Sequence, residues 1–311
     1  MKEINLPNLP FLKMNKPRTK IALDIGTSSV KTLALSHQKA GGIQLDLFAI
    51  QDINGERSKE IIVEAAKRAI ASLETKVQTV TISVSGQGVV VRQVLFPKMS
   101  EAELKSALQF EAEKHIPFNI NEVYIDAQVI DQNAEGNKMK VLIVASKKEL
   151  VDEYLGYIKE AGLEAEAIDC DAIAVTNAFL FNNPGAGKDK TIALLNIGAS
   201  MTNVCILKNE TLNFTRDIPV EVKSTDTLEN QVRLSFDYYE NQFGKGIDGI
   251  YASGGGARET PLLQRFSQAF GLEVQAWDPT KILSVSPKVD AQALKEASGR
   301  LAVCVGLAIR R

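Results

Sequence analysis

The chain repeats a short pattern of strands and small-residue turns in its two halves. The first half has three strand-like runs, at residues 20–25, 30–36 and 43–53, with the turn Gly26-Thr27-Ser28-Ser29 between the first two. The second half repeats that order at residues 191–197, 202–207 and 211–217, around the turn Gly198-Ala199-Ser200. A unit that recurs once in each half predicts an internal duplication, and therefore two related lobes.

Helices and further strands are predicted around these units. Capping residues and apolar residues at helical spacing predict helices over 58–73, 100–116, 146–161, 227–243, 260–270 and 293–309. Two of these starts, Ser100–Glu103 and Ser146–Glu149, have the pattern of a capping box. Alternating or apolar runs predict strands over 79–84, 89–96, 123–130, 140–145 and 249–253. The turn-rich residues 182–187 predict the boundary between the halves.

Composition excludes several classes of protein. The 311 residues are 45% hydrophobic and 24% charged, which is typical of about two soluble domains. With 36 basic and 38 acidic residues, the net charge of −2 gives no field that would attract nucleic acid or an anionic membrane. The cysteines Cys170, Cys205 and Cys304 lie in apolar runs and are expected to be buried thiols. The two histidines, His37 and His115, have no neighbouring ligand pair, so we expect no zinc site.

Neither end of the chain has the pattern of a membrane signal. Residues 1–20 lack the apolar core of a signal peptide, so we expect a cytoplasmic protein. The apolar run Leu301–Ile309 is half the length of a membrane span. It is compatible with a buried closing helix or with a surface-lying anchor, and we expect the buried helix and no direct membrane insertion.

The turn after the first strand is a candidate phosphate site. Gly26 allows close approach of the backbone, Thr27, Ser28 and Ser29 can supply amides and hydroxyls, and Lys31 can neutralise charge. Asp24, at the end of the strand, could hold Mg²⁺ through water. An ordinary hairpin with an aspartate in its turn is the alternative.

Two more loops match this interpretation. Asn196, Gly198, Ala199, Ser200 and Thr202 give the second turn the same shape as the first, so that the two turns could clamp a nucleotide tail. Gly254, Gly255 and Gly256 follow a strand and precede a helix, as a loop against which a nucleoside could lie. Together the three loops predict a nucleotide site.

The three loops in this order resemble the actin-like ATPase superfamily. The middle of the chain is similar to its PilM family, FtsA-like proteins of type IV pilus assembly, in the segments Glu111–Phe118, Glu122–Val123, Asp126–Val129, Val144–Glu149 and Val232–Tyr239. Val305–Arg310 resembles the closing helix of the superfamily. The resemblance covers about residues 20–311.

This resemblance implies an α/β fold of the actin-like (ribonuclease H-like) type with two duplicated lobes. It implies an extended arm over 1–19, a first-lobe core over 20–97, an inserted partner-binding subdomain over 98–167, a return to the first lobe with a linker over 168–190, and a second lobe over 191–311. The outer subdomain of the second lobe is expected to be shortened around 218–245.

The resemblance also implies partners. In similar proteins the N-terminal tail of the membrane protein PilN binds between the inserted subdomain and the first lobe. By that likeness the groove is lined by Phe110, Ile116, Phe118, Val123 and Ile125, although these side chains could equally be core residues. An adaptor of this kind would link PilN and PilO to the pilus motor ATPases at the inner membrane, and so serve pilus biogenesis and twitching motility.

Two departures from the superfamily concern ATP and Mg²⁺, the cofactors that the resemblance implies. Asn196 stands where similar proteins carry Asp, which removes one of two carboxylates facing the metal. The segment 218–226 is short where the superfamily has residues that contact the nucleoside. Glu229 and Arg233 could partly replace these residues, and a surface ion pair is the alternative. We therefore expect weak or absent ATP turnover, with nucleotide binding weakened or lost.

The arm suggests self-association. Ile4-Asn5-Leu6-Pro7 resembles the start of PilN's own tail, although a chance match of four residues is the alternative. As a hypothesis, the arm could occupy the partner groove of its own or of a neighbouring molecule.

Other functions remain open at this point. The fold also occurs in components of type II secretion and of cell division, and in ATP-dependent small-molecule kinases. A division protein would need a membrane helix at its end, and a kinase would need a catalytic residue and substrate-binding insertions, which residues 98–167 do not resemble.

Overall fold

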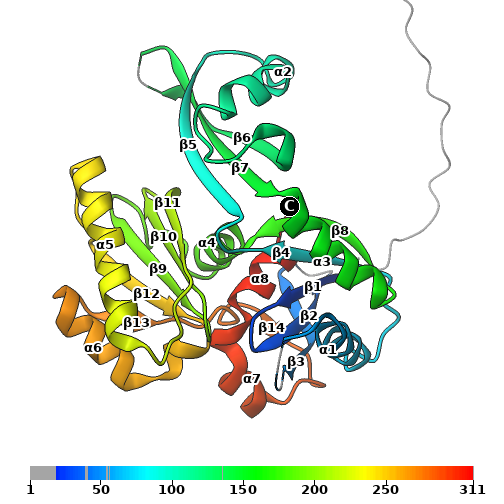
Figure 1. Ribbon diagram of the computed structural model, residues 1–311. Coiled ribbons are helices and arrows are strands. Elements are labelled where there is room, and N and C mark those ends of the chain that lie inside the picture. Colours follow the sequence, from blue (N-terminus) through cyan, green and yellow to red (C-terminus); the bar gives the residue numbers. More distant parts are fainter. Residues whose placement is uncertain (1–18, 39–40, 54, 56, 135, 311) are drawn as a thin grey trace, which may run out of the picture.

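The two halves of the chain build sheets of the same topology. The computed structural model describes residues 19–38, 41–53, 55, 57–134 and 136–310. It shows two lobes and a smaller domain that projects from them (Figure 1). The arm at residues 1–18 lies outside the described residues, and with it the hypothesis of self-association.

The sheet of the first lobe begins with an antiparallel meander. Its strands are β1 (Lys20–Ile25), β2 (Ser29–His37), β3 (Ile43–Asp52), β4 (Thr79–Val84), β8 (Glu164–Cys170) and β14 (Ser284–Val285). They lie in the order β14-β3-β2-β1-β4-β8, with β4 parallel to β1. The last strand, β14, comes from the second half of the chain and pairs with β3, so the two halves are interleaved at this edge.

The second lobe repeats this plan. Its strands are β9 (Thr191–Ile197), β10 (Thr202–Lys208), β11 (Thr211–Ile218), β12 (Gly249–Ser253) and β13 (Val274–Ala276), in the order β11-β10-β9-β12-β13. The first three form an antiparallel meander, and β12 runs parallel to β9 as β4 does to β1. The duplication predicted from the sequence is therefore confirmed.

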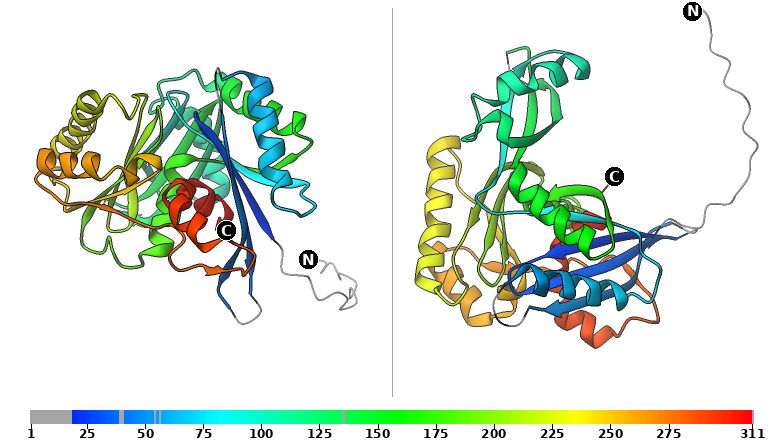
Figure 2. Two further views of the ribbon diagram at one scale, coloured as in Figure 1. Left: turned by 90° about the horizontal axis from the view of Figure 1, so that it is seen from below. Right: turned by 45° about the vertical axis from the view of Figure 1, so that its right-hand side comes forward.

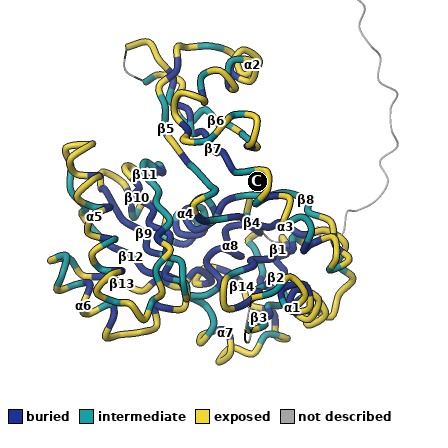
Figure 3. Tube along the Cα trace, viewed as in Figure 1, coloured by how far each residue is buried: buried dark blue, intermediate teal, exposed yellow. Residues whose placement is uncertain are grey.

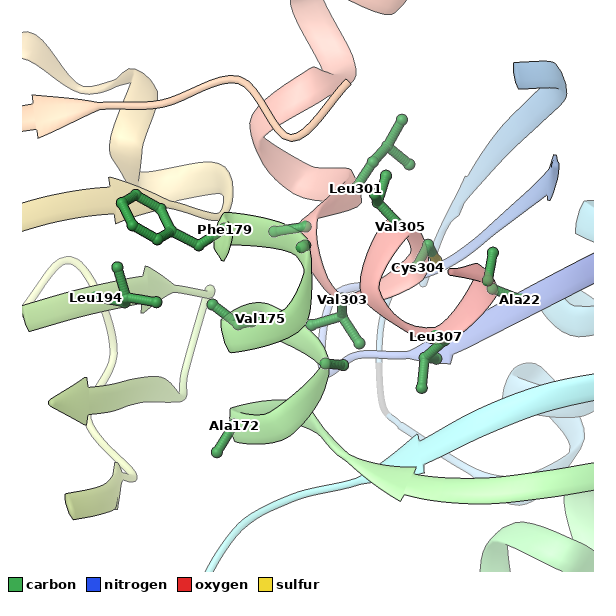
Figure 4. Packing of buried hydrophobic residues seen from close by; sticks show 14 of the residues in the cluster. Ala22, Ala172, Val175, Phe179, Leu194, Leu301, Val303, Cys304, Val305 and Leu307 are labelled. Atoms are coloured by element: carbon green, nitrogen blue, oxygen red, sulfur yellow. The ribbon is translucent and has the colours of Figure 1, made fainter. Parts of the chain in front are cut away.

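Two buried helices lie between the sheets. These are α4 (Asp171–Asn182) and α8 (Ala302–Ala308), and their side chains share one core with residues of both lobes, such as Ala22 of β1 and Leu194 of β9 (Figure 4). The three cysteines are free and buried in this region, as predicted. No helix among the described residues is long and apolar enough to span a membrane.

The outer faces of the two sheets are covered by separate pairs of helices. In the first lobe, α1 (Lys59–Ala71) and α3 (Lys148–Glu160) pack on the sheet. In the second lobe, α5 (Thr225–Phe243) and α6 (Thr260–Phe270) do so. Each lobe is thus a layer of helices on a sheet, with α4 and α8 shared in the middle (Figure 2).

The small domain has its own sheet and core. Strands β5 (Val89–Pro97), β7 (Lys138–Lys147) and β6 (Val123–Ala134) lie in the order β5-β7-β6, and α2 (Glu101–Ala112) covers one face. Its domain bounds are 89–147 rather than the predicted 98–167, because β5 pairs with β7, while α3 and β8 pack in the first lobe. The outer part of the domain, around α2, has a core of its own and projects from the lobes (Figure 3), whereas Val91 at the base of β5 is buried in the core that the two lobes share.

Several local predictions can be compared with the structure. Ser58 caps α1, and Ser100 and Glu103 form the predicted capping box of α2. The second capping box is wrong, because Ser146 is a buried residue of β7 and α3 begins at Lys148. The closing helix is interrupted: α7 (Ala291–Ala297) and α8 are separated by a 3-10 turn, where the Gly299 carbonyl accepts a hydrogen bond from the Gly254 amide.

Candidate functional site

The first candidate phosphate turn joins β1 and β2. The amide of Gly26 donates to the carbonyl of Ser29 over 3.0 Å and closes the turn, which leaves Thr27 and Ser28 exposed at its tip. Asp24 and Lys31 are cross-strand partners, and Lys31 Nζ lies 2.8 Å from Asp24 Oδ2. Both side chains are largely buried, so the carboxylate at the end of β1 is neutralised by the neighbouring strand.

Charge and burial act against each other on Lys31. Burial lowers the pKa of Lys31, but the charge and hydrogen bond of Asp24 outweigh burial and leave that pKa above its ordinary value. The Lys31 ammonium is therefore held as a cation against the turn. A Cβ built on Gly26 would lie 2.7 Å from Lys31 Nζ, so a larger residue there would push the ammonium aside from its present position.

The second turn joins β9 and β10 and has the same hydrogen bond. The amide of Gly198 donates to the Met201 carbonyl over 2.9 Å, which corresponds to the bond between Gly26 and Ser29. Ala199 is exposed at its tip, Ser200 is half-buried and Thr202 is buried. The two turns are thus equivalent in backbone as well as in sequence order.

An amide pair takes the place of the ion pair in the second turn. Asn196 and Asn203 are cross-strand partners, as Asp24 and Lys31 are, and Asn196 Nδ2 donates to Asn203 Oδ1 over 2.9 Å. The remaining oxygen, Asn196 Oδ1, accepts from the hydroxyl of Ser253 over 3.3 Å. The second turn therefore presents no carboxylate at the end of its first strand.

The glycine loop packs directly on the second turn. Gly254 has φ +84°, and a Cβ there would lie 2.3 Å from the carbonyl oxygen of Ile197. A Cβ on Gly256 would lie 2.4 Å from Cγ2 of the same Ile197, whereas Gly255 has nearly open space. The fold thus brings together the second turn and the loop over 254–256.

Glu229 and Arg233 join two helices. Glu229 accepts from Arg265 Nε of α6 over 2.7 Å, and Arg233 lies 3.6 Å from Glu229. Arg233 also donates to the Ala269 carbonyl and lies over the ring of Phe270, both on α6. These contacts are those of an ion pair that holds α5 against α6, and none of them reaches the glycine loop.

Two acidic side chains that the sequence analysis did not single out lie where the lobes meet. Asp171, at the start of α4, accepts from the hydroxyl of Ser83 over 2.6 Å. Asp217 of β11 accepts from Asn203 Nδ2 and from the amide of Gly86, which belongs to the first lobe. Both line a cavity of about 170 Å³ between the lobes.

The surroundings of these two carboxyl groups favour their protonated forms. Burial, and next the charge of Asp24, raise the pKa of Asp171 to about 7. Burial also raises the pKa of Asp217, although hydrogen bonds from Asn203 and Gly86 act in the other direction. Asp171 is the first residue of a helix and Asp217 lies near the end of a strand, far apart in the sequence, so only the fold shows that they meet.

The strand ends fit a magnesium nucleotide poorly. A Mg²⁺ ion favours carboxylate oxygens, and the one carboxylate at these strand ends, Asp24, is already paired with Lys31. Asn196 is bonded to its neighbours on both sides. Among the residues that the structure describes, no group of three or more His, Cys, Asp or Glu side chains could hold a metal ion.

The predicted partner-binding residues divide into two places. Ile116 and Val123 are buried in one small apolar cluster at the base of the small domain, and Phe118 and Ile125 pack against it half-buried. Phe110 is 75% exposed on α2 and does not belong to that cluster. Four of the five residues therefore come together.

This cluster adjoins the first lobe. Lys147 lies over the ring of Phe118, and Lys148, the first residue of α3, lies over the ring of Tyr124. The Tyr124 hydroxyl donates to Asp152 of α3 over 3.2 Å. Half-exposed aromatic side chains thus mark the junction between the small domain and α3.

Comparison with known proteins supports the family resemblance that the sequence indicates. A family model described as type IV pilus assembly protein PilM matches residues 22–220 and 223–311. The fold is similar to a chain of a solved PilM–PilN type IV pilus biogenesis complex, with a TM-score of 0.83, 21% identity, and coverage of 95% of this chain and 99% of that chain.

Two more distant structures share the fold. The ethanolamine utilization protein EutJ from Carboxydothermus hydrogenoformans gives a TM-score of 0.54 at 12% identity, with 94% of this chain and 90% of that chain covered. The cytoplasmic domain of EpsL, an inner-membrane component of the type II secretion system of Vibrio cholerae, gives 0.50 at 12% identity, with 90% and 94% covered. The predicted two-lobe actin-like fold is confirmed by these matches together.

Proposed function

The chain belongs to the PilM family of type IV pilus assembly proteins, and on this basis we propose that it is an adaptor of the pilus assembly platform that binds the N-terminal tail of a PilN-type membrane protein. The observation that carries this proposal is the presence of the whole small domain, since the match to the PilM–PilN complex extends over 99% of that chain. The proposal places the protein in the cytoplasm, held at the inner membrane through PilN.

The junction between the small domain and α3 is the proposed site for the tail. Phe118, Tyr124 and Ile125 offer partly exposed apolar surface there, beside the buried Ile116 and Val123. A tail with aliphatic side chains would bury these surfaces and contribute about 25 cal/mol per Å² of apolar area removed from water. Phe110 is left out of this site because it lies on the exposed surface of α2.

Nucleotide binding is proposed to be weakened or lost. The backbone of both turns is compatible with a phosphate site, but the polar side chains beside each turn already bind each other. Asp24 forms an ion pair with Lys31, and Asn196 donates a hydrogen bond to Asn203. A bound Mg²⁺ would have to displace the Lys31 ammonium from the only carboxylate at these strand ends. The adaptor role therefore needs no turnover of ATP.

Contacts to PilO and to the motor ATPases complete the proposal. Bound to PilN, the adaptor would pass the state of the membrane platform, of which PilO is a part, to the motor on the cytoplasmic side. The near-zero net charge suits a protein recruited by another protein rather than by lipid or nucleic acid. The family match favours this role over the alternatives of a secretion or division component and of a small-molecule kinase.

Isothermal titration of the full chain tests the proposal with two ligands. A synthetic peptide of the PilN N-terminal tail is expected to bind, and Mg·ATP is expected to bind much more weakly or not at all. Phe118→Ala should weaken peptide binding by about tenfold, because it removes an aromatic contact worth about 1.4 kcal/mol. Phe110→Ala is the matched control, and it should leave the affinity unchanged.

Three results would contradict the proposal. If neither ligand binds, the adaptor role is contradicted. Tight binding of Mg·ATP would contradict the proposal that nucleotide binding is weakened or lost. Equal losses in the two phenylalanine variants would show that the tail binds elsewhere. The same titration with a chain lacking residues 1–17 tests the hypothesis on the arm, which predicts tighter peptide binding once the arm is gone.

A further inference from the structure

A second groove lies on the other face of the small domain. It has a volume of about 640 Å³ and separates strand β5 of the small domain from the β10–β11 hairpin and helix α5 of the second lobe. Leu95 of β5 and Lys140 of β7 are cross-strand partners in its wall. Ala145, five residues further along β7, points to the opposite face and into the cluster proposed for PilN.

Two sheet edges meet at this groove. β5 is the outer strand of the small sheet, and β11 is the outer strand of the second-lobe sheet. They are connected where the side chain of Gln93 donates to the Leu212 carbonyl and accepts from Asn213 Nδ2. Beyond Gln93, β5 continues to Pro97 with β7 as its one neighbouring strand. An edge of this kind can accept an added extended strand.

Exposed apolar side chains border that edge. Leu95 is 49% exposed, Tyr238 of α5 is 56% exposed, and Phe243 is 40% exposed, and all three line the groove. The ring of Tyr238 lies 5.6 Å from that of Phe214 on β11, which holds it at the wall. A grouping of large apolar side chains around a hollow marks a binding surface more often than scattered single residues do.

The charges around the groove are unbalanced. Arg92, Lys140 and Lys208 line it, against the single carboxylate of Asp131. None of the three cations forms an ion pair within the described part of the chain, although Asp131 lies opposite Lys140 on the neighbouring strand and the protein as a whole carries a net charge of −2. An unpaired cationic rim around an apolar floor is complementary to an acidic segment with apolar side chains.

From these four features we infer that the groove binds an extended, acidic segment of a partner protein, which adds as a strand to the free edge of β5. Its alternate apolar side chains would contact Leu95, Tyr238 and Phe243, and its carboxylates would meet Lys140, Lys208 and Arg92. This is a second binding surface, separate from the one proposed for PilN. An adaptor with one site on each face of the small sheet could hold two partners at once.

Fluorescence anisotropy of the full chain tests this inference with a defined probe. The probe is a labelled ten-residue peptide that alternates glutamate with leucine and valine, compared with the same peptide carrying lysine for glutamate. We expect the acidic peptide to bind about tenfold more tightly at low salt, and to lose affinity as salt is raised. A version with N-methylated backbone amides should bind about tenfold more weakly, since it cannot pair with β5.

Variants locate the binding. Lys208→Glu should lower the affinity for the acidic peptide about fivefold and raise the affinity for the lysine peptide, because the substitution reverses a charge at the rim of the groove. Lys288→Glu, at a position that is also exposed but does not line the groove, is the matched control and should change neither affinity. Leu95→Ser should weaken the acidic peptide without lowering the affinity for the PilN peptide, which separates this inference from the proposed function.

Other results would overturn the inference. Equal affinity for the acidic and lysine peptides would show that charge does not select the ligand, and unchanged binding of the N-methylated peptide would exclude strand addition. Dimerisation in sedimentation velocity that is lost in Leu95→Ser would show that a second copy of the chain fills the groove instead.

Discussion

At the scale of single residues, the two equivalent hairpins differ in the pair of side chains that joins their strands. Asp24 and Lys31 of the first hairpin correspond to Asn196 and Asn203 of the second, and each pair is joined across its own two strands. An ion pair and an amide pair are both neutral overall and fill the same place. The hairpin is therefore kept in both halves, while a carboxylate at the end of its first strand is present in only one of them.

Asp171 makes stability depend on pH. Its pKa is raised to about 7 by burial and by the charge of Asp24. Between about pH 4 and pH 7 the folded protein holds a proton that the unfolded chain has released, so this group's contribution to stability falls as pH rises. Asp171→Asn is neutral at every pH and should lack this loss, which amounts to at most about 1.4 kcal/mol per pH unit.

Urea unfolding at pH 5, 6, 7 and 8 measures this difference. The advantage of Asp171→Asn over the unaltered protein should grow with pH and level off above about pH 7. Asp237→Asn, at an exposed position of α5, is the control and should follow the unaltered protein at every pH. Parallel curves for the two variants would contradict the assignment.

The sequence was informative for some site residues and silent on others. The turns and the glycine loop could be predicted because glycine and small polar residues after a strand form a local pattern. Asp171 and Asp217 could not, because they lie 46 residues apart in the sequence and meet only through the packing of α4 against β11. The family resemblance groups Phe110 with Phe118, but it does not show which side of α2 a residue lies on, and Phe110 lies on the exposed side of that helix.

At the scale of elements, the hairpins and amphipathic helices were predictable and the central helix was not. Helix α4 is apolar on nearly all sides, since the lobes cover it from both directions, and so it has no polar face to give it a helical period. The pairing of β5 with β7 was missed for another reason. Strand pairing joins residues about 50 positions apart, and no local signal shows which sheet a strand will join.

The contact between α4 and α8 depends on one glycine. A Cβ built on Gly306 of α8 would lie 1.8 Å from the carbonyl oxygen of Ala174 on α4, so the two backbones approach too closely for any side chain. Gly306→Ala would force the helices apart within a closely packed core. We expect a loss of roughly 1–3 kcal/mol, or more, in the free energy of unfolding.

Gly156→Ala provides the control for that substitution. Gly156 lies in α3, and a Cβ there would have nothing within 4 Å, so alanine should be neutral or stabilise the helix by up to about 1 kcal/mol. Thermal and urea unfolding of the two variants should move in opposite directions. A Gly306→Ala protein as stable as the unaltered chain would show that α8 does not approach α4 as closely as described.

At the scale of the whole molecule, the two lobes share a single core. Side chains of β1 and β2 in the first lobe and of β9 and β10 in the second pack against the same two helices, α4 and α8 (Figure 4). Leu301, immediately before α8, is fully buried among them. If one lobe separated from α4 and α8, the apolar side chains of the other sheet that pack in the same core would be exposed to water.

The small domain is different, because Phe96, Met139 and Val141 form a core with the buried side of α2. It is connected to the lobes by the base of β5 and β7, where Val91 is buried in the shared core, by contacts with α3, and by the Gln93 hydrogen bonds to β11. A domain of this kind can unfold locally while the lobes stay folded. An adaptor with binding surfaces on both faces of this domain would use that independence.

Hydrogen exchange can therefore separate two cooperative units. Met139→Ala should lower the free energy of unfolding of the small domain by about 2–5 kcal/mol. In this variant, amide exchange should become faster in β5, β6 and β7, while β1 and β9 stay protected. Leu301→Ala removes a fully buried side chain of similar size from the shared core. This substitution should speed hydrogen exchange in β1 and β9 together, because side chains of both strands pack against α4 and α8 in the shared core. Faster exchange in one lobe alone after Leu301→Ala would mean that the two lobes unfold separately. Faster exchange in β1 or β9 after Met139→Ala would mean that the small domain does not unfold as a separate unit.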